Sequence, residues 1–288
     1  MKIFKFSALV CMFAVIVFMP SRICLADKKI NIVASTPDLA SIASNIGGDK
    51  IIVLSITKGN GDPHSVEVLP YYMMQAAKAD IFLKVGLSLD QWADSIIKGS
   101  GNKELKTVDC SKNIRVFEKD LFADMSKGHA HPDGNPHYWL NPLNSIIIAE
   151  NIKKALIETD KANKDYYENN FIAFKSKIEI SYGQWKEKMS SLKGKTFISY
   201  HSSWVYFADA FDMEIAANVE PFPGIPPTAK HLSELIKIIK EKDVKFLLQE
   251  TYFSKSAGKF LNKNTQIKVI IKSPSGAQTE AEGYFNYF

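Results

Sequence analysis

Short apolar runs alternate with amphipathic stretches after the first 28 residues. The apolar runs are rich in Ile and Val and predict buried strands at Lys29–Ser35, Ile51–Ile56 and Ile81–Val85. The amphipathic stretches have helical spacing and predict helices at Pro37–Ile46, Val66–Ala79 and Leu89–Lys98. Continuous apolar strands that alternate with helices indicate an α/β fold whose parallel sheet is covered on both faces.

The same alternation returns in the last third of the chain. Strands are predicted at Lys195–Tyr200, Glu214–Val219, Val244–Gln249 and Lys268–Lys272. Helices are predicted at Ser203–Phe211, Ala229–Lys240 and Ser254–Leu261, with Thr228 as an N-cap. These elements predict a second α/β lobe.

The region between the two alternating patterns has a different character. Residues 109–136 are polar and turn-rich, which predicts a long loop, and Leu143–Thr159 reads as a helix. Lys161–Ser191 contains no proline and could form one helix of about 30 residues, long enough to join two lobes. We therefore expect an N-terminal lobe over residues 27–145, a helical segment over 146–193 and a C-terminal lobe over 194–288.

The first 26 residues have the organisation of a secretory signal peptide. Lys2 and Lys5 precede the apolar run Phe6–Met19, and small residues end at Ala26, where we expect cleavage and export to the periplasm. A membrane anchor is the alternative. Lipid anchoring through Cys24 is not expected, because Ile23 stands where a lipoprotein signal has a small residue.

Composition and charge narrow the class of protein. The 288 residues are 46% hydrophobic and 23% charged, which is typical of a globular chain. Three of the five net positive charges lie before Asp27, so the mature chain is almost neutral and no nucleic-acid partner is expected. Cys110 is the single cysteine after the signal and is expected to be a structural thiol.

Three of the six histidines occupy comparable positions. His64 follows the second predicted strand, His201 follows the strand that begins the second lobe, and His137 stands at the exit of the long loop. Ligands of open α/β sheets bind at the carboxyl ends of strands, so these side chains could converge in a cleft. Three neutral imidazoles suit zinc, copper, nickel or cobalt, and Asp62 and Asn141 could fix the ring tautomers as outer partners.

Four segments carry a family resemblance: GDPHSVEVLP, NPHYWLNP, FISYHSSWVYFADAF and EPFPGIPPTAKHLSELI. From about Lys29 onward the sequence resembles the metal-binding proteins of bacterial zinc and manganese ABC importers. The resemblance implies two Rossmann-like lobes joined by one long rigid helix, with the metal in the cleft between them. It places the family's three histidine ligands on His64, His137 and His201.

The resemblance also implies a function, a metal and partners. It predicts an extracytoplasmic solute-binding protein that captures Zn²⁺ and delivers it, as a monomer, to an inner-membrane ABC permease. Manganese-type members commonly have a carboxylate at the third ligand position, so His201 favours zinc over Mn²⁺.

The chain departs from the family pattern at the fourth ligand. Many members take it from an aspartate in the segment that matches residues 271–276, which here reads IKSPSG. Glu250, Glu282 or water could supply the fourth ligand, and the alternative interpretation of Glu250 is a structural, hydrogen-bonding carboxylate in the cleft. The family also usually continues into a terminal helix after residues resembling YFNYF, and lack of that helix could expose apolar surface on the second lobe.

Further histidines allow weaker predictions. His129 and His131 resemble a much reduced version of the family's histidine-rich loop, and they either bind metal transiently or are simply solvated. His231 is expected to be structural. Trp139, Trp204 and Tyr206 are expected to pack in the core and to keep the site dry.

Alternative functions are manganese or mixed-metal binding, an adhesin role, siderophore binding and, more distantly, zinc-dependent hydrolysis. The segment His129-Ala-His131-Pro-Asp133-Gly134 partly resembles the HxHxDH motif of metallo-β-lactamase-like hydrolases, but its last histidine is replaced by Gly134. We therefore do not expect an enzyme.

Overall fold

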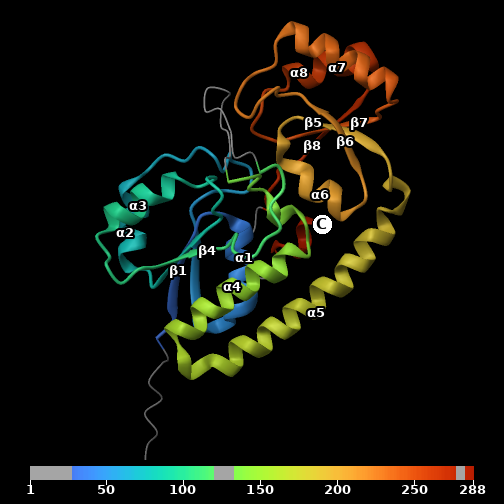
Figure 1. Ribbon diagram of the computed structural model, residues 1–288. Helices are drawn as coiled ribbons and strands as arrows, with labels where there is room; N and C mark the ends of the chain where they lie inside the picture. Colours follow the sequence, from blue (N-terminus) through green and yellow to red (C-terminus); the bar gives the residue numbers. More distant parts are fainter. Residues whose placement is uncertain (1–27, 120–132, 277–282) are drawn as a thin grey trace, which may run out of the picture.

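Two parallel four-stranded sheets form the framework of the protein (Figure 1). The computed structural model describes residues 28–119, 133–276 and 283–288. The first sheet has the order β2-β1-β3-β4, formed by β1 (Ile30–Ala34), β2 (Ile51–Ser55), β3 (Ile81–Lys84) and β4 (Lys106–Asp109). The second sheet has the order β6-β5-β7-β8, formed by β5 (Thr196–Ser199), β6 (Glu214–Asn218), β7 (Phe246–Gln249) and β8 (Lys268–Ile271).

Helices cover both faces of each sheet, as the apolar strands require. The first lobe has α1 (Pro37–Gly47), α2 (Pro70–Lys78), α3 (Trp92–Ser100) and α4 (Asn144–Thr159). The second lobe has α6 (Val205–Ala210), α7 (Ala229–Glu241) and α8 (Ser256–Thr265). Apolar side chains of α2 and α3 pack on one face of the first sheet and those of α1 and α4 on the other, while α7 and α8 pack together over the second sheet.

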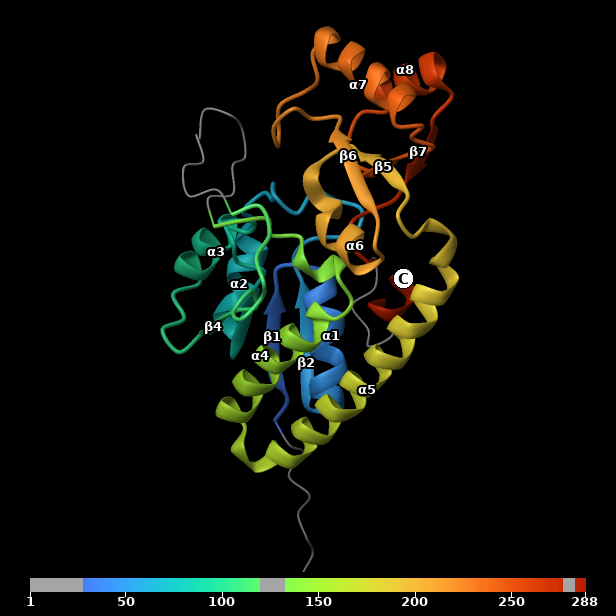
Figure 2. The same cartoon turned by 45° about the vertical axis from the view of Figure 1, so that its right-hand side comes forward.

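The helix α5 (Lys164–Lys188) joins the two lobes, as the sequence predicted (Figure 2). Near its start, the Asn170 side chain donates to the carbonyl oxygen of Ile46 over 2.9 Å. Near its end, the Tyr182 hydroxyl donates to the carbonyl oxygen of Ala210 over 2.6 Å. At 1.5 Å per residue its 25 residues span about 37 Å, so one helix contacts both lobes.

Two local predictions differ from the structure. The helix predicted from Val66 begins only at Pro70, because the proline ring forces the preceding Leu69 into an extended conformation. The strand β4 was not predicted, since its sequence KTVD is short and half polar, as is common at a sheet edge. Thr228 does cap α7, with its hydroxyl accepting from the amide of His231.

A second connection between the lobes follows β8. The Trp139 indole donates to the carbonyl oxygen of Pro274 over 2.7 Å, and the amide of Gly276 donates to Asp38 of α1 over 3.0 Å. Farther along, the amide of Tyr284 donates to the hydroxyl of Ser41 over 2.9 Å. The C-terminal lobe predicted over residues 194–288 therefore ends in a segment that hydrogen-bonds to the first lobe.

Some expectations fall on residues that the structure does not describe. These are the signal peptide with Cys24, and the side chains of His129, His131 and Glu282. Among the described helices, none is both long enough and apolar enough to cross a membrane. Cys110 is a buried free thiol, which agrees with the structural role expected for it.

Candidate metal centre

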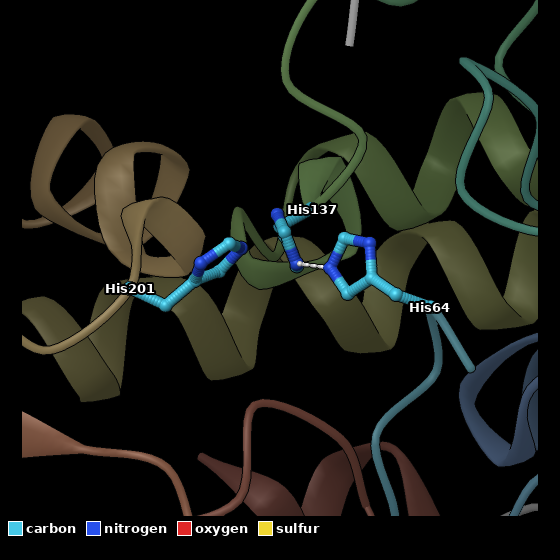
Figure 3. A group of neighbouring side chains, drawn as sticks. All are labelled: His64, His137 and His201. Atoms are coloured by element: carbon cyan, nitrogen blue, oxygen red, sulfur yellow. Dashed lines mark hydrogen bonds between the residues drawn. The ribbon is translucent and has the colours of Figure 1, made fainter. Parts of the chain in front are cut away.

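His64, His137 and His201 come together between the two sheets (Figure 3). One ring nitrogen from each lies within 4.8 Å of the other two, and the ring centroids are 5.2–5.4 Å apart. The Nε2 atoms of His64 and His137 are 3.2 Å apart. Residues far apart in the sequence thus present a cluster of nitrogen ligands.

The ends of the strands and two short turns position these rings. His201 lies two residues beyond the end of β5. His64 lies in the loop after β2, where its amide donates to Asp62 over 2.9 Å and the Trp92 indole donates to the carbonyl oxygen of Pro63 over 3.0 Å. His137 precedes a single 3₁₀ turn. Convergence at the carboxyl ends of parallel strands is the arrangement that the sequence predicted.

Two of the rings are oriented by polar side chains that sequence reasoning missed. The Nδ1 of His137 lies 3.0 Å from Oδ1 of Asn135, and the Nδ1 of His201 lies 2.8 Å from Oε2 of Glu220. An acceptor at Nδ1 fixes the proton there and leaves the Nε2 lone pair available. Both rings are almost fully buried, so the surrounding side chains restrict their rotation.

The outer partners that the sequence suggested have different contacts. Asp62 accepts from the backbone amide of His64. Asn141 accepts from the amide of Leu143 over 3.0 Å, and its Nδ2 lies 3.5 Å from Asp209. These contacts of Asn141 shape the turn before α4, and its role as an outer partner of a histidine ring stays a prediction.

The sequence held only part of a signal for Glu220, which follows the predicted strand Glu214–Val219 as His201 follows Lys195–Tyr200; the rest came from the pairing of these strands in the structure. Ser199 of β5 pairs with Asn218 of β6, so His201 and Glu220 each stand two residues beyond paired positions. The two side chains must therefore emerge next to each other at one sheet edge. Asn135 had a weaker signal, two residues before His137 in NPH.

Glu250 lies directly after β7 and is completely buried. Its Oε1 accepts from the Trp204 indole over 2.9 Å, and its Oε2 has no hydrogen-bond partner within the described chain. The cluster of metal-type ligands found among the described residues contains the three histidines and not Glu250. The carboxylate is thus near the centre without being one of the converging groups.

Burial and neighbouring polar or charged groups shift the pKa values of Glu250 and His201 in opposite directions. Burial raises the pKa of Glu250 to about 7, against the opposing effects of His201 and of hydrogen-bond donors. Burial lowers the pKa of His201, but the hydrogen bond to Glu220 and the charges of Glu250, Glu220 and Asp62 outweigh it, so the pKa is raised. The pocket is therefore electrostatically favourable for a cation.

Aromatic side chains surround the buried side of the centre. Trp139, Trp204 and Tyr206 are each 1% exposed, and the ring of Trp139 lies 5.4 Å from that of His137. The hydroxyl of Tyr206 donates to the carbonyl oxygen of Asn135 over 2.9 Å. Tyr206 therefore both packs in the core and holds the residue that contacts the His137 ring. On the other side, His64 and His201 border a cleft of about 860 Å³.

His231 lies outside this cluster. Its Nε2 is 3.0 Å from the carbonyl oxygen of Asn218, which agrees with the structural role expected for it.

Comparison with known proteins gives a consistent picture. A family model described as "Zinc-uptake complex component A periplasmic" matches residues 32–288. The metal ABC transporter substrate-binding lipoprotein SloC of Streptococcus mutans is 30% identical over 94% of this chain and 89% of its own length. The manganese ABC transporter substrate-binding lipoprotein of Streptococcus gordonii is 30% identical over 86% of this chain and 80% of its own.

The fold also matches a solved structure. The crystal structure of ZnuA aligns with a TM-score of 0.76 at 26% identity, covering 90% of this chain and 95% of that one. This similarity confirms the expected architecture of two α/β lobes with a long connecting helix.

One expectation is contradicted by the relatives. We did not expect a lipid anchor, but the relatives above are named lipoproteins. A mismatch at Ile23 alone is therefore a poor reason to exclude lipidation.

The family match spans nearly the whole described chain, and the match to the streptococcal lipoproteins covers most of both proteins. The chain belongs to the zinc-uptake component A family and is a metal-binding substrate-binding protein of an ABC transporter.

Proposed function

We propose that this protein captures Zn²⁺ through Nε2 of His64, His137 and His201 and delivers it to an ABC permease in the membrane. The observation that carries the proposal is the buried convergence of three imidazoles, with Nδ1 of two of them engaged by Asn135 and Glu220. The third, His64, is partly exposed toward the cleft and offers a route for the ion.

The spacing of the nitrogens supports this ligand set. Zinc binds imidazole nitrogen at about 2.0–2.1 Å, so two ligands of a tetrahedral ion are about 3.3 Å apart. The Nε2 atoms of His64 and His137 are separated by 3.2 Å. The Nε2 of His201 is buried and lacks a hydrogen-bond partner within the described chain, which is costly unless a cation binds it.

We propose water as the fourth ligand, with Glu250 as a charge-balancing group close to it. Three neutral imidazoles leave the ion's two positive charges uncompensated. Glu220 and Glu250 are 6% and 0% exposed, and both interact electrostatically with His201. A bound cation would stabilise the ionised form of Glu250, whose pKa burial raises to about 7.

Zinc is favoured over manganese by the chemistry of the ligands. An all-nitrogen set suits the borderline-soft Zn²⁺, whereas Mn²⁺ prefers carboxylate and other oxygen ligands. Manganese remains the alternative metal, since one relative is named for manganese transport.

The remaining parts of the proposal follow from the site. One chain supplies all three ligands, so we propose a monomer, working in the periplasm. We also propose capture without catalysis, because the buried histidines and the family's transport role require no reaction of the ion.

The experiment is a zinc titration of the purified, metal-stripped protein in competition with a chromophoric chelator. Wild type is compared with His201→Ala and with the control His231→Ala, and manganese is added as a competitor. We expect one tight zinc site, an affinity loss of about 100-fold or more in His201→Ala, and little change in the control. Equal zinc binding by wild type and His201→Ala would refute the proposed ligand set, and displacement of zinc by equimolar manganese would refute the metal preference.

A further inference from the structure

Glu220 accepts hydrogen bonds from two parts of the chain, the ring of His201 and the backbone of a nearby loop. Its Oε2 accepts from Nδ1 of His201 over 2.8 Å and also from the backbone amide of Gly224 over 3.2 Å. One carboxylate oxygen therefore joins a ligand of the candidate metal centre to a backbone amide in the loop that follows β6.

The backbone of that loop is strongly constrained. The amide of Ile225 donates to the carbonyl oxygen of Phe222 over 3.0 Å, which closes a four-residue turn. Pro223 and Gly224 are its central residues, and Gly224 has φ of +78°, the pattern of a type II turn. Four prolines among residues 221–227 further limit the freedom of the loop, so it should move as a unit.

The turn forms part of the wall of the cleft beside the metal centre, so its movement would change the shape of that cleft. Gly224, Pro226 and Pro227 line the cleft of about 860 Å³ that also borders His64 and His201. Phe222, the first residue of the turn, is 44% exposed. The carboxylate itself is buried, so its link to the turn is shielded from competing water.

Coordination of a cation at Nε2 of His201 would change the relative strengths of the two hydrogen bonds that Oε2 of Glu220 accepts. The metal withdraws electron density from the ring, which makes its Nδ1–H a stronger donor to the carboxylate. Because the same oxygen also accepts from Gly224, a stronger bond to the ring leaves less electron density for the bond to the turn, and we expect that bond to lengthen. Binding of the cation therefore changes the position of the turn.

We propose that Glu220 is a positioning residue that couples metal binding at His201 to the Phe222–Ile225 turn, so that this wall of the cleft reports whether the ion is bound. The inference rests on the proposed function, because it requires the cation to bind at Nε2 of His201.

A nuclear magnetic resonance measurement tests the coupling directly. Pro223 and Gly224 form the chain's single Pro-Gly pair, so carbonyl-¹³C proline with ¹⁵N-glycine selects the Gly224 amide alone. During a zinc titration of the purified protein, we expect this amide proton to shift upfield and to reach its endpoint together with zinc binding measured on the same sample.

Variants separate coupling from simple structural support. In Glu220→Gln we expect zinc affinity to fall about 10–100-fold and the zinc-induced shift of Gly224 to be lost. Glu220→Asp keeps the charge and should restore part of both. Glu214→Gln changes an exposed glutamate of β6, the strand that precedes Glu220, and should leave affinity and shift unchanged.

The outcomes distinguish this inference from the proposed function. If wild type binds zinc tightly while the Gly224 amide does not move, the coupling is wrong and zinc capture stands. The same holds if Glu220→Gln keeps the full shift. If wild type binds no zinc, both fall together. The wild-type titration is decisive even if a variant fails to fold.

Discussion

Asn135 and His137 are joined twice: Oδ1 of Asn135 accepts from the backbone amide of His137 and lies 3.0 Å from Nδ1 of its ring. The Nδ2 of Asn135 in turn donates to Glu118 over 2.8 Å and to the carbonyl oxygen of Ser202 over 2.7 Å. This side chain thus fixes one candidate ligand and ties it to the loop that carries His201.

Substitution of Asn135 tests this arrangement. We expect Asn135→Ala to lower zinc affinity about 10–100-fold, because the ring of His137 loses its partner at Nδ1. The control is Asn141→Ala, whose contacts are with Leu143 and Asp209, and it should retain affinity. Chelator competition measures both. Equal losses in the two variants would mean that Asn135 has no special relation to the site.

Glu250→Gln separates a metal ligand from a charge-balancing group. If water is the fourth ligand, zinc affinity should fall about tenfold, well short of the loss in His201→Ala. Because the folded-state pKa is raised, the metal-free variant should be more stable than wild type at pH 8 by about 1–3 kcal/mol. A loss of affinity as large as that of His201→Ala would instead make Glu250 a direct ligand.

Zinc binding should weaken as the pH falls. The raised pKa of His201 keeps its ring protonated to a higher pH than a free histidine, so proton competition should begin above pH 6.5. Dissociation constants measured between pH 5.5 and 8.5 test this expectation. A constant affinity down to pH 6 would contradict it.

Asp38 should make the metal-free protein less stable as the pH rises. Burial raises its pKa from 3.8 to about 6, against the donors Ser275 and Gly276. Since the folded-state pKa is the higher one, the contribution of Asp38 is complete below about pH 4 and is lost as the pH passes 6, by up to about 3 kcal/mol.

The variant Asp38→Asn should remove this dependence. Urea unfolding at pH 4.5, 5.5 and 7 should show the stability difference moving in favour of Asp38→Asn as the pH rises. Asp243→Asn, at an exposed carboxylate, serves as the matched control. Parallel pH profiles of wild type and Asp38→Asn would disprove the effect.

The placement of His64 and His201 at one edge of the sheets followed from their sequence relation to strands, whereas His137 was assigned to the site through the family resemblance. Once parallel sheets were predicted, His201, directly after a strand, and His64, in the loop after β2, were expected on the side of the carboxyl ends, and the structure brings their rings together. The long helix was equally readable, because its stretch of sequence contains no proline.

The polar side chains that contact the histidine rings, Asn135 and Glu220, could not be predicted from the sequence in this way. Asp62 and Asn141 were chosen for closeness in sequence, whereas Glu220 depends on the pairing of β5 with β6. That pairing is a tertiary fact, since neighbours in a parallel sheet are set by crossover connections and not by short turns. The beginning of α2 and the edge strand β4 were missed for local reasons, a proline and a short polar sequence.

The segment after β8 also has a consequence for how the chain folds. Residues 284 and 285 are 1% and 8% exposed, within the same core as α1, α4 and α5. Topologically the second sheet is an insertion into the first lobe, since the chain leaves that lobe along α5 and returns to it after β8. The first lobe therefore cannot complete its core until the inserted sheet has emerged. We expect the two lobes to unfold in one cooperative transition.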